Sequence, residues 1–171
     1  MPSVGHVAVG LAASRLSVAN ARPRIGWTLG LVALSCLPDA DVIAFTLGIP
    51  YSAPFGHRGA SHSLAFGVLC GLGVAALAAM IRAPATRMGL IAAAVVASHG
   101  LLDTLTDGGL GAALLWPFSN ERFFAPWRPI PVAPIGARLL SAHGLELMLR
   151  ECVLFLPLFV AGLWPRRAAR D

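Results

Sequence analysis

The sequence predicts an all-α protein, a multi-pass membrane bundle of about four to five helices with a long loop rich in proline and aromatic residues. Hydrophobic residues make up 57% of the 171 residues and charged residues 12%, with a mean hydropathy of +0.74. This composition is too apolar for an ordinary soluble domain of this size. Residues 63–81 carry no charge, and at ~1.5 Å per residue they approach the ~30 Å of a bilayer core. We therefore expect one membrane-embedded domain over residues 1–171.

Each expected helix is an apolar run bounded by glycine or proline, and the runs lie near residues 4–18, 26–38, 62–81, 87–105 and 144–164. The first run is too short to span a bilayer alone, and it lacks the charged start and the small-residue cleavage site of a signal peptide. We therefore keep it as part of the mature protein. Three stretches besides 63–81 are candidate spans only, because their ionisable residues must face inward or lie near an interface; they are 25–49, 88–105 and 147–164.

The segment from Thr106 to Gly136 is the longest without a predicted helix, and it contains five of the prolines. Its aromatic residues argue against disorder; they are Trp116, Phe118, Phe123, Phe124 and Trp127. Long loops inside compact domains are commonly functional. We expect a lid, or a flap at the membrane interface.

All thirteen basic residues are arginine, and their distribution favours one orientation by the positive-inside rule. If all four stretches cross, one side receives Arg22, Arg24, Arg82, Arg87, Arg166, Arg167 and Arg170, and the other receives Arg58, Arg122, Arg128 and Arg138. The larger set predicts the cytoplasmic face and places 50–62 and 106–146 outside. The pI near 10.5 fits attraction to anionic lipid. Nucleic-acid binding is not expected, because the basic residues form no stripe with interleaved aromatics.

Polar residues within the apolar runs are the first candidates for a metal site, because ionisable groups at hydrophobic depth must be neutralised, hydrated or paired. His99 and Asp103 are four residues apart in one predicted helix, so they lie about 5–6 Å from each other on one face. Pro38 favours a break in the preceding helix, which lets Asp39 and Asp41 converge from a turn.

Three further histidines join this set. His57 and His62 flank the turn at Gly59, and Ser61 is a natural N-cap for a helix that begins at His62. His6 lies in the first apolar run. In the crossing scheme above, the helix ends that carry these residues all lie towards the same face of the membrane.

The candidate metal ligands are thus His6, Asp39, Asp41, His57, His62, His99 and Asp103. Imidazole and carboxylate together suit zinc, with manganese or iron as alternatives. Seven ligands exceed the three or four that a single catalytic zinc takes, and two ions a few ångströms apart, bridged by a carboxylate, would use them. Whether one ion or two bind is left open. Such a site activates a water and polarises a phosphoryl or acyl oxygen. Arg58 is placed to clamp a phosphate, and Asp41 to serve as ligand or general base.

Each residue also has a purely structural interpretation. His6 could cap or pack a helix, the two aspartates after Pro38 could terminate one, and His57 could be solvated in its loop. His99 and Asp103 could be a buried hydrogen-bonded pair that holds helices together. These interpretations would have to hold jointly, so metal binding is favoured. Charged residues in the second half are expected to form a solvated face or interfacial contacts; they are Glu121, Arg122 and Arg138.

The polar segments, in this order, resemble the YdjM-like family of bacterial inner-membrane, metal-dependent hydrolases. The matching motifs are Gly5-His6, Leu37 to Asp41, His57 to Ser63, His99 to Thr106, and Trp116-Pro117. The resemblance implies a multi-pass helical protein with ligands drawn from the seven residues above. Val42 and Asp107 depart from the family pattern, because members often carry a histidine and a proline there, so one further ligand is missing.

Beyond residue 130 the match to the family is weak. His143 and Glu146, three residues apart, could add a ligand at the head of the last helix, or simply begin that helix. The ligand order is also similar to that of zinc-dependent phospholipase C, an all-helical phosphodiesterase.

Three functional hypotheses follow. The leading one is a hydrolase in the bacterial inner membrane that acts on a phosphoester or a lipid-linked ester, with membrane lipid or a small molecule as substrate and Asp107 orienting it. The second is a non-enzymatic membrane protein that binds a structural or transported ion, although an ion pathway would place carboxylates through the whole depth of the bundle. The third is a scaffold with buried polar pairs and no metal. The oligomeric state is left open.

Overall fold

The computed structural model describes residues 4–16, 25–134 and 136–164, and its regular elements are all helical. The described segments contain two isolated β-bridges, Thr106–Ile130 and Ala112–Phe123, and no strand. The all-α prediction is therefore confirmed. In chain order the elements are α1 (Val4–Ala13), α2 (Ile25–Cys36), η1 (Leu37–Val42), α3 (Ile43–Thr46), η2 (Ala60–His62), α4 (Leu64–Met80), α5 (Ala85–Asp103), η3 (Gly136–Leu140), α6 (Ala142–Leu154) and α7 (Leu156–Leu163), where η denotes a 3-10 helix.

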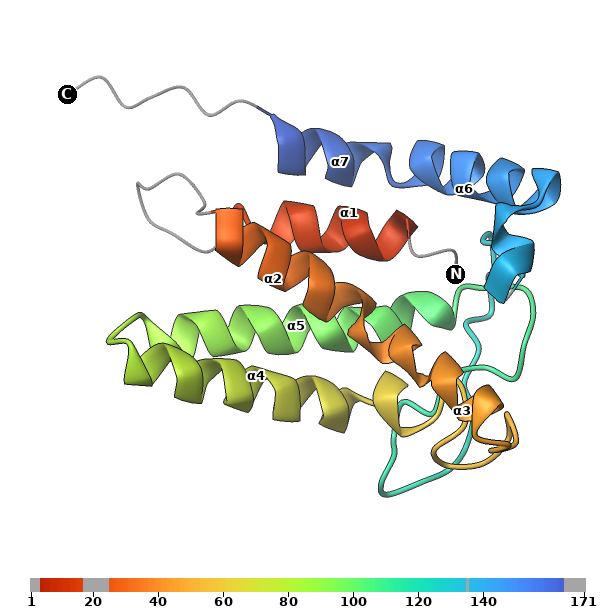
Figure 1. Ribbon diagram of the computed structural model, residues 1–171, viewed down its shortest axis with the longest axis horizontal. Helices are drawn as coiled ribbons and strands as arrows, with labels where there is room; N and C mark the ends of the chain where they lie inside the picture. The colour runs from red at the N-terminus through yellow and green to blue at the C-terminus, as the bar shows by residue number, and fades with distance from the viewer. Residues whose placement is uncertain (1–3, 17–24, 135, 165–171) are drawn as a thin grey trace.

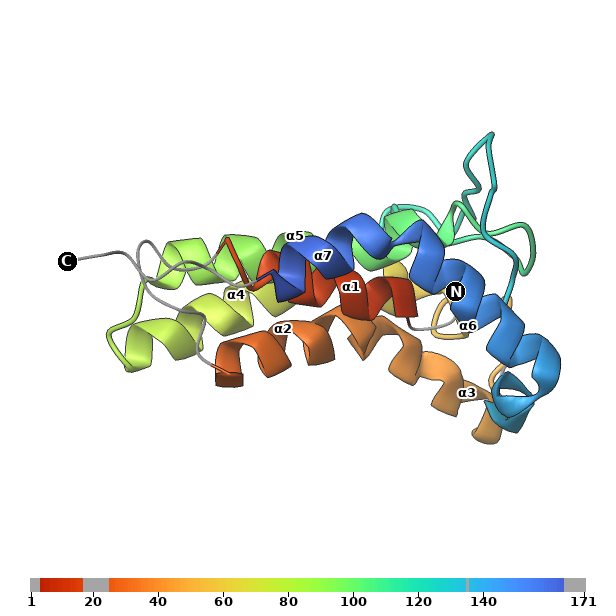
Figure 2. The same ribbon diagram turned by 90° about the horizontal axis from the view of Figure 1, so that it is seen from above.

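The longer helices run side by side along the long axis of the molecule (Figure 1). α1 packs against α2 and α7, and α5 packs against α4 and α2. α3, the segment that leads into α4 and the segment that follows α5 gather at one end of this bundle (Figures 1 and 2). η1, η2 and the last part of α5 contact one another there, so that end brings the predicted polar segments together.

Pro38 does not break the chain after α2. The helix tightens into η1 and continues as α3, with the proline at the start of the 3-10 turn. A proline is tolerated there because the first N–H groups of a helix have no partner within it. Asp39 and Asp41 therefore project from a 3-10 turn, in keeping with the expected turn or new helical start.

The start of α4 also differs from the prediction. Ser63 caps the helix, because its hydroxyl accepts a hydrogen bond from the Phe66 amide at 3.0 Å. The predicted cap, Ser61, instead donates to the carboxylate of Asp41 at 2.5 Å. The sequence offered two serines of equal capping strength, and the turn decides which one faces the helix.

The last predicted helix, 144–164, is two helices. α6 ends at Leu154 and α7 begins at Leu156, with Pro157 in its first turn. Proline removes a helical donor and clashes with the preceding turn, which explains the interruption. The end of the first predicted helix, 4–18, extends past the described residues, and α1 itself stops at Ala13.

α4 and α5 approach closely through small residues, as the glycine- and alanine-rich sequence predicts. A Cβ atom on Gly71 would lie 2.6 Å from the Cβ of Ala93, and one on Gly89 would lie 2.7 Å from the Cβ of Ala75. These distances are too short for real contacts, so the two backbones can meet only where the side chains are absent.

Two helical stretches in the described chain are long and apolar enough to cross a membrane by length and composition, Ile25–Thr46 and Ala85–Asp103. α4, which corresponds to the span that the sequence predicted most clearly, is one of the shorter apolar helices. α6 and α7 are shorter still, so the expected span 147–164 is interrupted. A multi-pass arrangement stays a prediction. Its orientation rests partly on Arg22, Arg24, Arg166, Arg167 and Arg170, which lie outside the described residues.

Candidate metal centre

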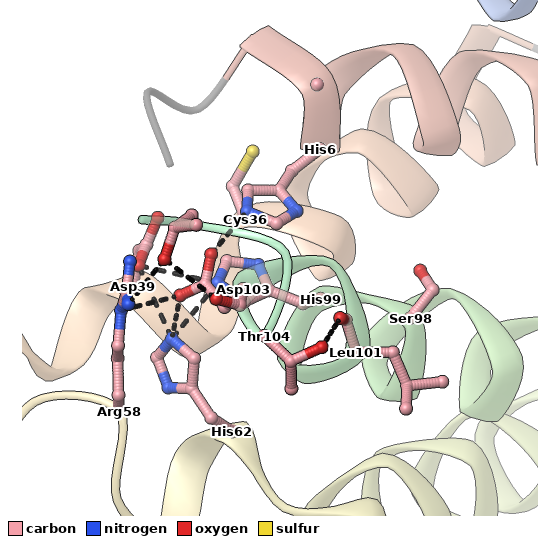
Figure 3. A network of polar contacts seen from close by, with 12 residues as sticks. His6, Cys36, Asp39, Arg58, His62, Ser98, His99, Leu101, Asp103 and Thr104 are labelled. Atoms are coloured by element: carbon pink, nitrogen blue, oxygen red, sulfur yellow. Dashed lines mark hydrogen bonds and ion pairs between the residues drawn. The ribbon is translucent and has the colours of Figure 1, made fainter. Parts of the chain in front are cut away.

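Five of the predicted ligands converge beside the end of α5, together with Arg58 (Figure 3). His6 comes from α1, Asp39 from η1, His62 from η2, and His99 and Asp103 from α5. His6, His62, His99 and Asp103 are buried, and the side chain of Asp39 is 19% exposed. The helix spacing of His99 and Asp103 and the turn after α2 together bring these distant parts of the sequence to one point.

Four of these residues form what we call the four-donor cluster, defined by Asp39, His62, His99 and Asp103, in which one ligand atom from each lies within 4.8 Å of the others. Nε2 of His62 lies 3.1 Å from Nε2 of His99, 3.3 Å from Oδ2 of Asp103 and 3.5 Å from Oδ1 of Asp39. Nε2 of His99 lies 3.3 Å from the same Asp39 oxygen.

The hydrogen bonds at the far side of each imidazole decide what faces the cluster. Nδ1 of His99 lies 2.7 Å from the carbonyl oxygen of Ser35, which can only accept, so Nδ1 donates. Nδ1 of His62 lies 3.2 Å from Oδ2 of Asp41 and 3.0 Å from the Ser61 hydroxyl, which itself donates to Asp41. If both rings are neutral with their protons on Nδ1, each Nε2 presents a lone pair. The two lone pairs then face each other and the carboxylates of Asp39 and Asp103, and a cation among these four groups is needed to offset their repulsion.

The electrostatics of His62 agree with this requirement. Burial lowers its pKa, but hydrogen bonds to Asp103, Asp39 and Asp41 outweigh burial and raise the pKa to about 10. The surrounding carboxylates therefore hold a positive charge at this position, either a proton on His62 or a metal ion in its place.

The spacing of the donors fits a metal ion. In a tetrahedral site with bonds of ~2.0–2.1 Å, neighbouring ligand atoms lie about 3.3 Å apart. Four of the six donor–donor distances in the cluster are 3.1, 3.3, 3.3 and 3.5 Å, and all six lie within 4.8 Å. Imidazole nitrogens held by a backbone carbonyl or a carboxylate on the opposite side are also typical of metal-binding histidines. The cluster could therefore hold a metal ion.

Arg58 lies against the cluster with its side chain almost wholly buried. Its Nε is 3.0 Å from Oδ2 of Asp103, and one terminal nitrogen donates to Thr106 Oγ1 at 2.8 Å and to the Gly108 carbonyl at 3.1 Å. Its φ of 58° lies in the left-handed region, which costs a non-glycine residue about 1–2 kcal/mol. The guanidinium thus balances the charge of Asp103, and its predicted contact with a substrate phosphate stays a prediction. Because it is buried here, Arg58 is not a membrane-topology signal.

Asp41 and His57 form a separate unit, the Asp41–His57 pair. Oδ1 of Asp41 lies 2.6 Å from Nδ1 of His57, and Oδ2 accepts hydrogen bonds from the Arg58 amide at 3.0 Å and the Ser61 hydroxyl at 2.5 Å. With His62, these residues make a second group that could hold an ion. Here, however, Nδ1 of His57 carries a proton and donates it to the carboxylate of Asp41. The contact is therefore satisfied without a cation.

His6 reaches the cluster from the side. Its ring stacks on that of His99 with centroids 3.5 Å apart and planes 10° apart, and its Nε2 is 3.6 Å from Oδ1 of Asp103. It is not one of the four donors that meet within ligand distance of one another. Its place beside the cluster depends on where α1 begins.

The structure does not bring His143 and Glu146 to the site. Both side chains are exposed, and Glu146 accepts from Arg150 at 2.7 Å while lying 4.0 Å from His143. Asp107 accepts a hydrogen bond from the Val132 amide at 2.7 Å, within the long loop. Its predicted contact with substrate stays a prediction.

Arg122 lies neither on a solvated face nor simply at an interface, the two places expected for it. The guanidinium is partly buried and donates to the carbonyls of His57, Tyr51 and Ala53 at 3.0–3.1 Å. It therefore ties the long loop to the segment that carries His57. Backbone carbonyls leave no signal in a sequence, so this role was not predictable.

Comparison with known proteins gives one family and one curated relative. The family described as YdjM inner membrane protein matches residues 1–168. The chain is 41% identical over 141 residues to inner membrane protein YbcI of Escherichia coli (strain K12), covering 80% of this chain and 82% of the relative. No solved structure matches. The similarity to zinc-dependent phospholipase C is not among these findings.

Proposed function

Because the chain belongs to the YdjM inner membrane protein family, we propose that it is a membrane-bound, metal-dependent hydrolase of phosphoester or lipid-linked ester substrates. One observation carries the proposal. Nε2 of His62 and Nε2 of His99 face each other at 3.1 Å with two carboxylates beside them, an arrangement that needs a positive charge, either a proton on His62 or a metal ion. The ligand types make zinc the first expectation, with manganese or iron as alternatives.

The four-donor cluster would hold one ion. A divalent ion there would lower the pKa of a water and polarise the ester oxygen under attack. A second ion at the Asp41–His57 pair would have to break their 2.6 Å hydrogen bond. One ion is therefore the expected content.

The Asp41–His57 pair supplies the base. With Nδ1 of His57 committed to Asp41, only Nε2 remains to accept a proton from a nucleophilic water. The carboxylate fixes the tautomer and the ring orientation, and it stabilises the imidazolium that forms, as in other aspartate–histidine pairs. Asp41 thus acts through His57, whereas the sequence pointed to Asp41 as a ligand or the base itself.

Arg58 is the second charged group proposed for catalysis. Its guanidinium lies beside Oδ2 of Asp103 and brings a fixed positive charge to the edge of the cluster. That charge favours an anionic transition state even without direct contact. Direct contact with a phosphate would require the guanidinium to leave Thr106 and Gly108.

The aromatic loop supports a substrate that comes from the bilayer. The side chains of Phe118 and Trp127 are 93% and 71% exposed, and Phe55 in the neighbouring loop is 65% exposed. Rings of this kind are favoured at the level of lipid headgroups. The loop leaves the bundle at the end that carries the ligands and extends sideways from it (Figure 2). A lipid headgroup lying beneath the loop would be near the cluster.

The non-enzymatic alternative has a specific observation in its favour. Four protein donors complete the coordination of a structural zinc, whereas catalytic zinc keeps one position for water. Asp39, the most exposed of the four, would have to leave or share its position in an enzyme. A metal that takes five or six ligands removes this conflict.

The test is hydrolysis by purified protein in detergent, loaded in turn with zinc, manganese and iron. Substrates are a soluble phosphodiester, a phospholipid and a lipid-linked phosphoester. The matched variants are His57→Ala, which removes the base, and Glu146→Ala, which removes an exposed carboxylate far from the cluster. Turnover that is lost in His57→Ala and kept in Glu146→Ala supports the hydrolase. Bound metal without turnover on any substrate favours the non-enzymatic alternative.

A further inference from the structure

A carboxylate lies in the buried face of α6, in a part of the chain that the sequence motifs do not reach. Leu147, Glu151 and Phe155 are four residues apart and all are buried, so they form one face of the helix. Phe155 packs with Ala8 of α1 and Ile130 of the long loop. Glu151 thus occupies a position where an apolar side chain would be expected.

Glu151 binds the beginning of α1. Its Oε2 accepts a hydrogen bond from the amide of Gly5 at 3.2 Å, across 146 residues of sequence. The first amides of a helix have no partner within it, so an oxygen acceptor from another helix can satisfy one of them. Glu151 therefore acts on α1 as a capping residue does, but from another helix.

The cost of this arrangement suggests a role beyond stability. A buried carboxylate is expensive unless it is fully paired. Among the described residues, Oε1 of Glu151 has no hydrogen-bond partner. An apolar residue would pack α6 on α1 at lower cost, but it would leave the direction of the first turn of α1 less fixed.

That turn carries His6, whose position depends on it. Gly5 precedes His6, whose ring stacks on His99 at 3.5 Å and whose Nε2 lies 3.6 Å from Asp103. Both of those residues belong to the four-donor cluster. We propose that Glu151 is a positioning residue of the metal centre, which holds the start of α1 through the Gly5 amide and so sets His6 against the cluster. The inference rests on the proposed metal centre.

The test is a double-mutant cycle read by metal affinity. Glu151→Ala, His6→Ala and the double variant are compared with the wild type by competition with a chromophoric chelator. Loss of an outer partner that orients metal ligands typically weakens metal binding about 10–100-fold, and His6 lies against two such ligands, His99 and Asp103. We expect Glu151→Ala alone to weaken metal binding by that factor relative to the wild type. In the His6→Ala background, adding Glu151→Ala should leave the metal affinity nearly unchanged.

Glu151→Gln separates the hydrogen bond from the charge, because its side-chain oxygen can still accept from Gly5. We expect near-normal affinity in this variant, and Glu146→Ala on the same helix serves as the surface control. Circular dichroism and gel filtration establish that each variant is folded. If Glu151→Ala fails to fold, Glu151→Gln carries the test, alone and with His6→Ala.

Two results overturn the inference while leaving the metal centre intact. The first is unchanged affinity in folded Glu151→Ala, or an equal loss with and without His6. The second is a loss in Glu151→Gln as large as in Glu151→Ala. Absence of bound metal in the wild type is a different result, since it overturns the proposed centre itself.

Discussion

The four-donor cluster and the Asp41–His57 pair lie on opposite sides of the His62 ring, because Asp41 is 3.2 Å from its Nδ1 and the cluster faces its Nε2, and they differ in one respect. In the cluster, two imidazole nitrogens face each other and two carboxylates with no proton assigned between the rings. In the pair, a nitrogen faces an oxygen at 2.6 Å as donor and acceptor. Histidines and aspartates at similar spacing thus have different surroundings, and the hydrogen bonds on the outer side of each ring are the basis for proposing a metal site at one and a base at the other.

The largest effect is expected when residues are removed from the cluster and from the pair in turn. His99→Ala/Asp103→Ala deletes two of the four donors and should abolish stoichiometric metal, because two remaining donors bind weakly. His57→Ala should keep its metal. Elemental analysis of the folded proteins measures both. Equal loss of metal in the two variants would contradict the distinction.

The second prediction concerns turnover. Asp41→Asn should lower kcat about 10²–10⁴-fold, because it removes the carboxylate that fixes the tautomer of His57 and stabilises its charged form. Metal content should stay at the wild-type level. The measurement is steady-state hydrolysis beside elemental analysis of the same sample, and a parallel loss of metal would make Asp41 a ligand instead.

The third prediction concerns protons released by the cluster. Carboxylates hold the pKa of His62 at about 10 despite its burial, so the metal-free ring is charged at pH 7. Since a metal ligand must be neutral, binding releases this proton, and affinity should rise about tenfold per pH unit below that pKa. Calorimetry in buffers of different ionisation enthalpy counts the protons. Binding without proton release would contradict the assignment.

Substitutions in the middle of α4, away from the cluster, are expected to have the smallest effect on metal content. Gly71→Ala should cost about 1–3 kcal/mol of stability, because its Cβ would meet α5, while Gly73→Ala meets nothing and should be neutral or slightly stabilising. Unfolding in mixed detergent measures the difference. Metal content should not change in either variant. Equal stability of the two would show that α4 and α5 are not in such close contact.

The sequence was a good guide to the fold where a signal is local. Apolar runs located the helices, and the glycine- and alanine-rich stretch of α4 fits its close approach to α5. It failed at 144–164, where Pro157 divides one apolar run into α6 and α7. It also overstated the break at Pro38, since a proline at the start of a 3-10 turn leaves the helix continuous.

The sequence indicated which residues form the candidate site, but it did not indicate the role of each one. The structure brings His6, Asp39, His62, His99 and Asp103 together as the spacing suggested. The division between ligand and base could not be foreseen, because it depends on contacts such as Ser35 carbonyl to His99. Glu151 was missed for a related reason. A single glutamate in an apolar helix gives no sign that it caps another helix 146 residues away.

The central claim is that the four-donor cluster holds one metal ion. The most direct measurement is the metal content per chain of wild-type protein, purified in detergent without chelator and shown to be folded. The account predicts a single zinc, manganese or iron ion per chain. Folded protein without stoichiometric metal would contradict it and would make the facing imidazoles a buried polar network held by a proton on His62.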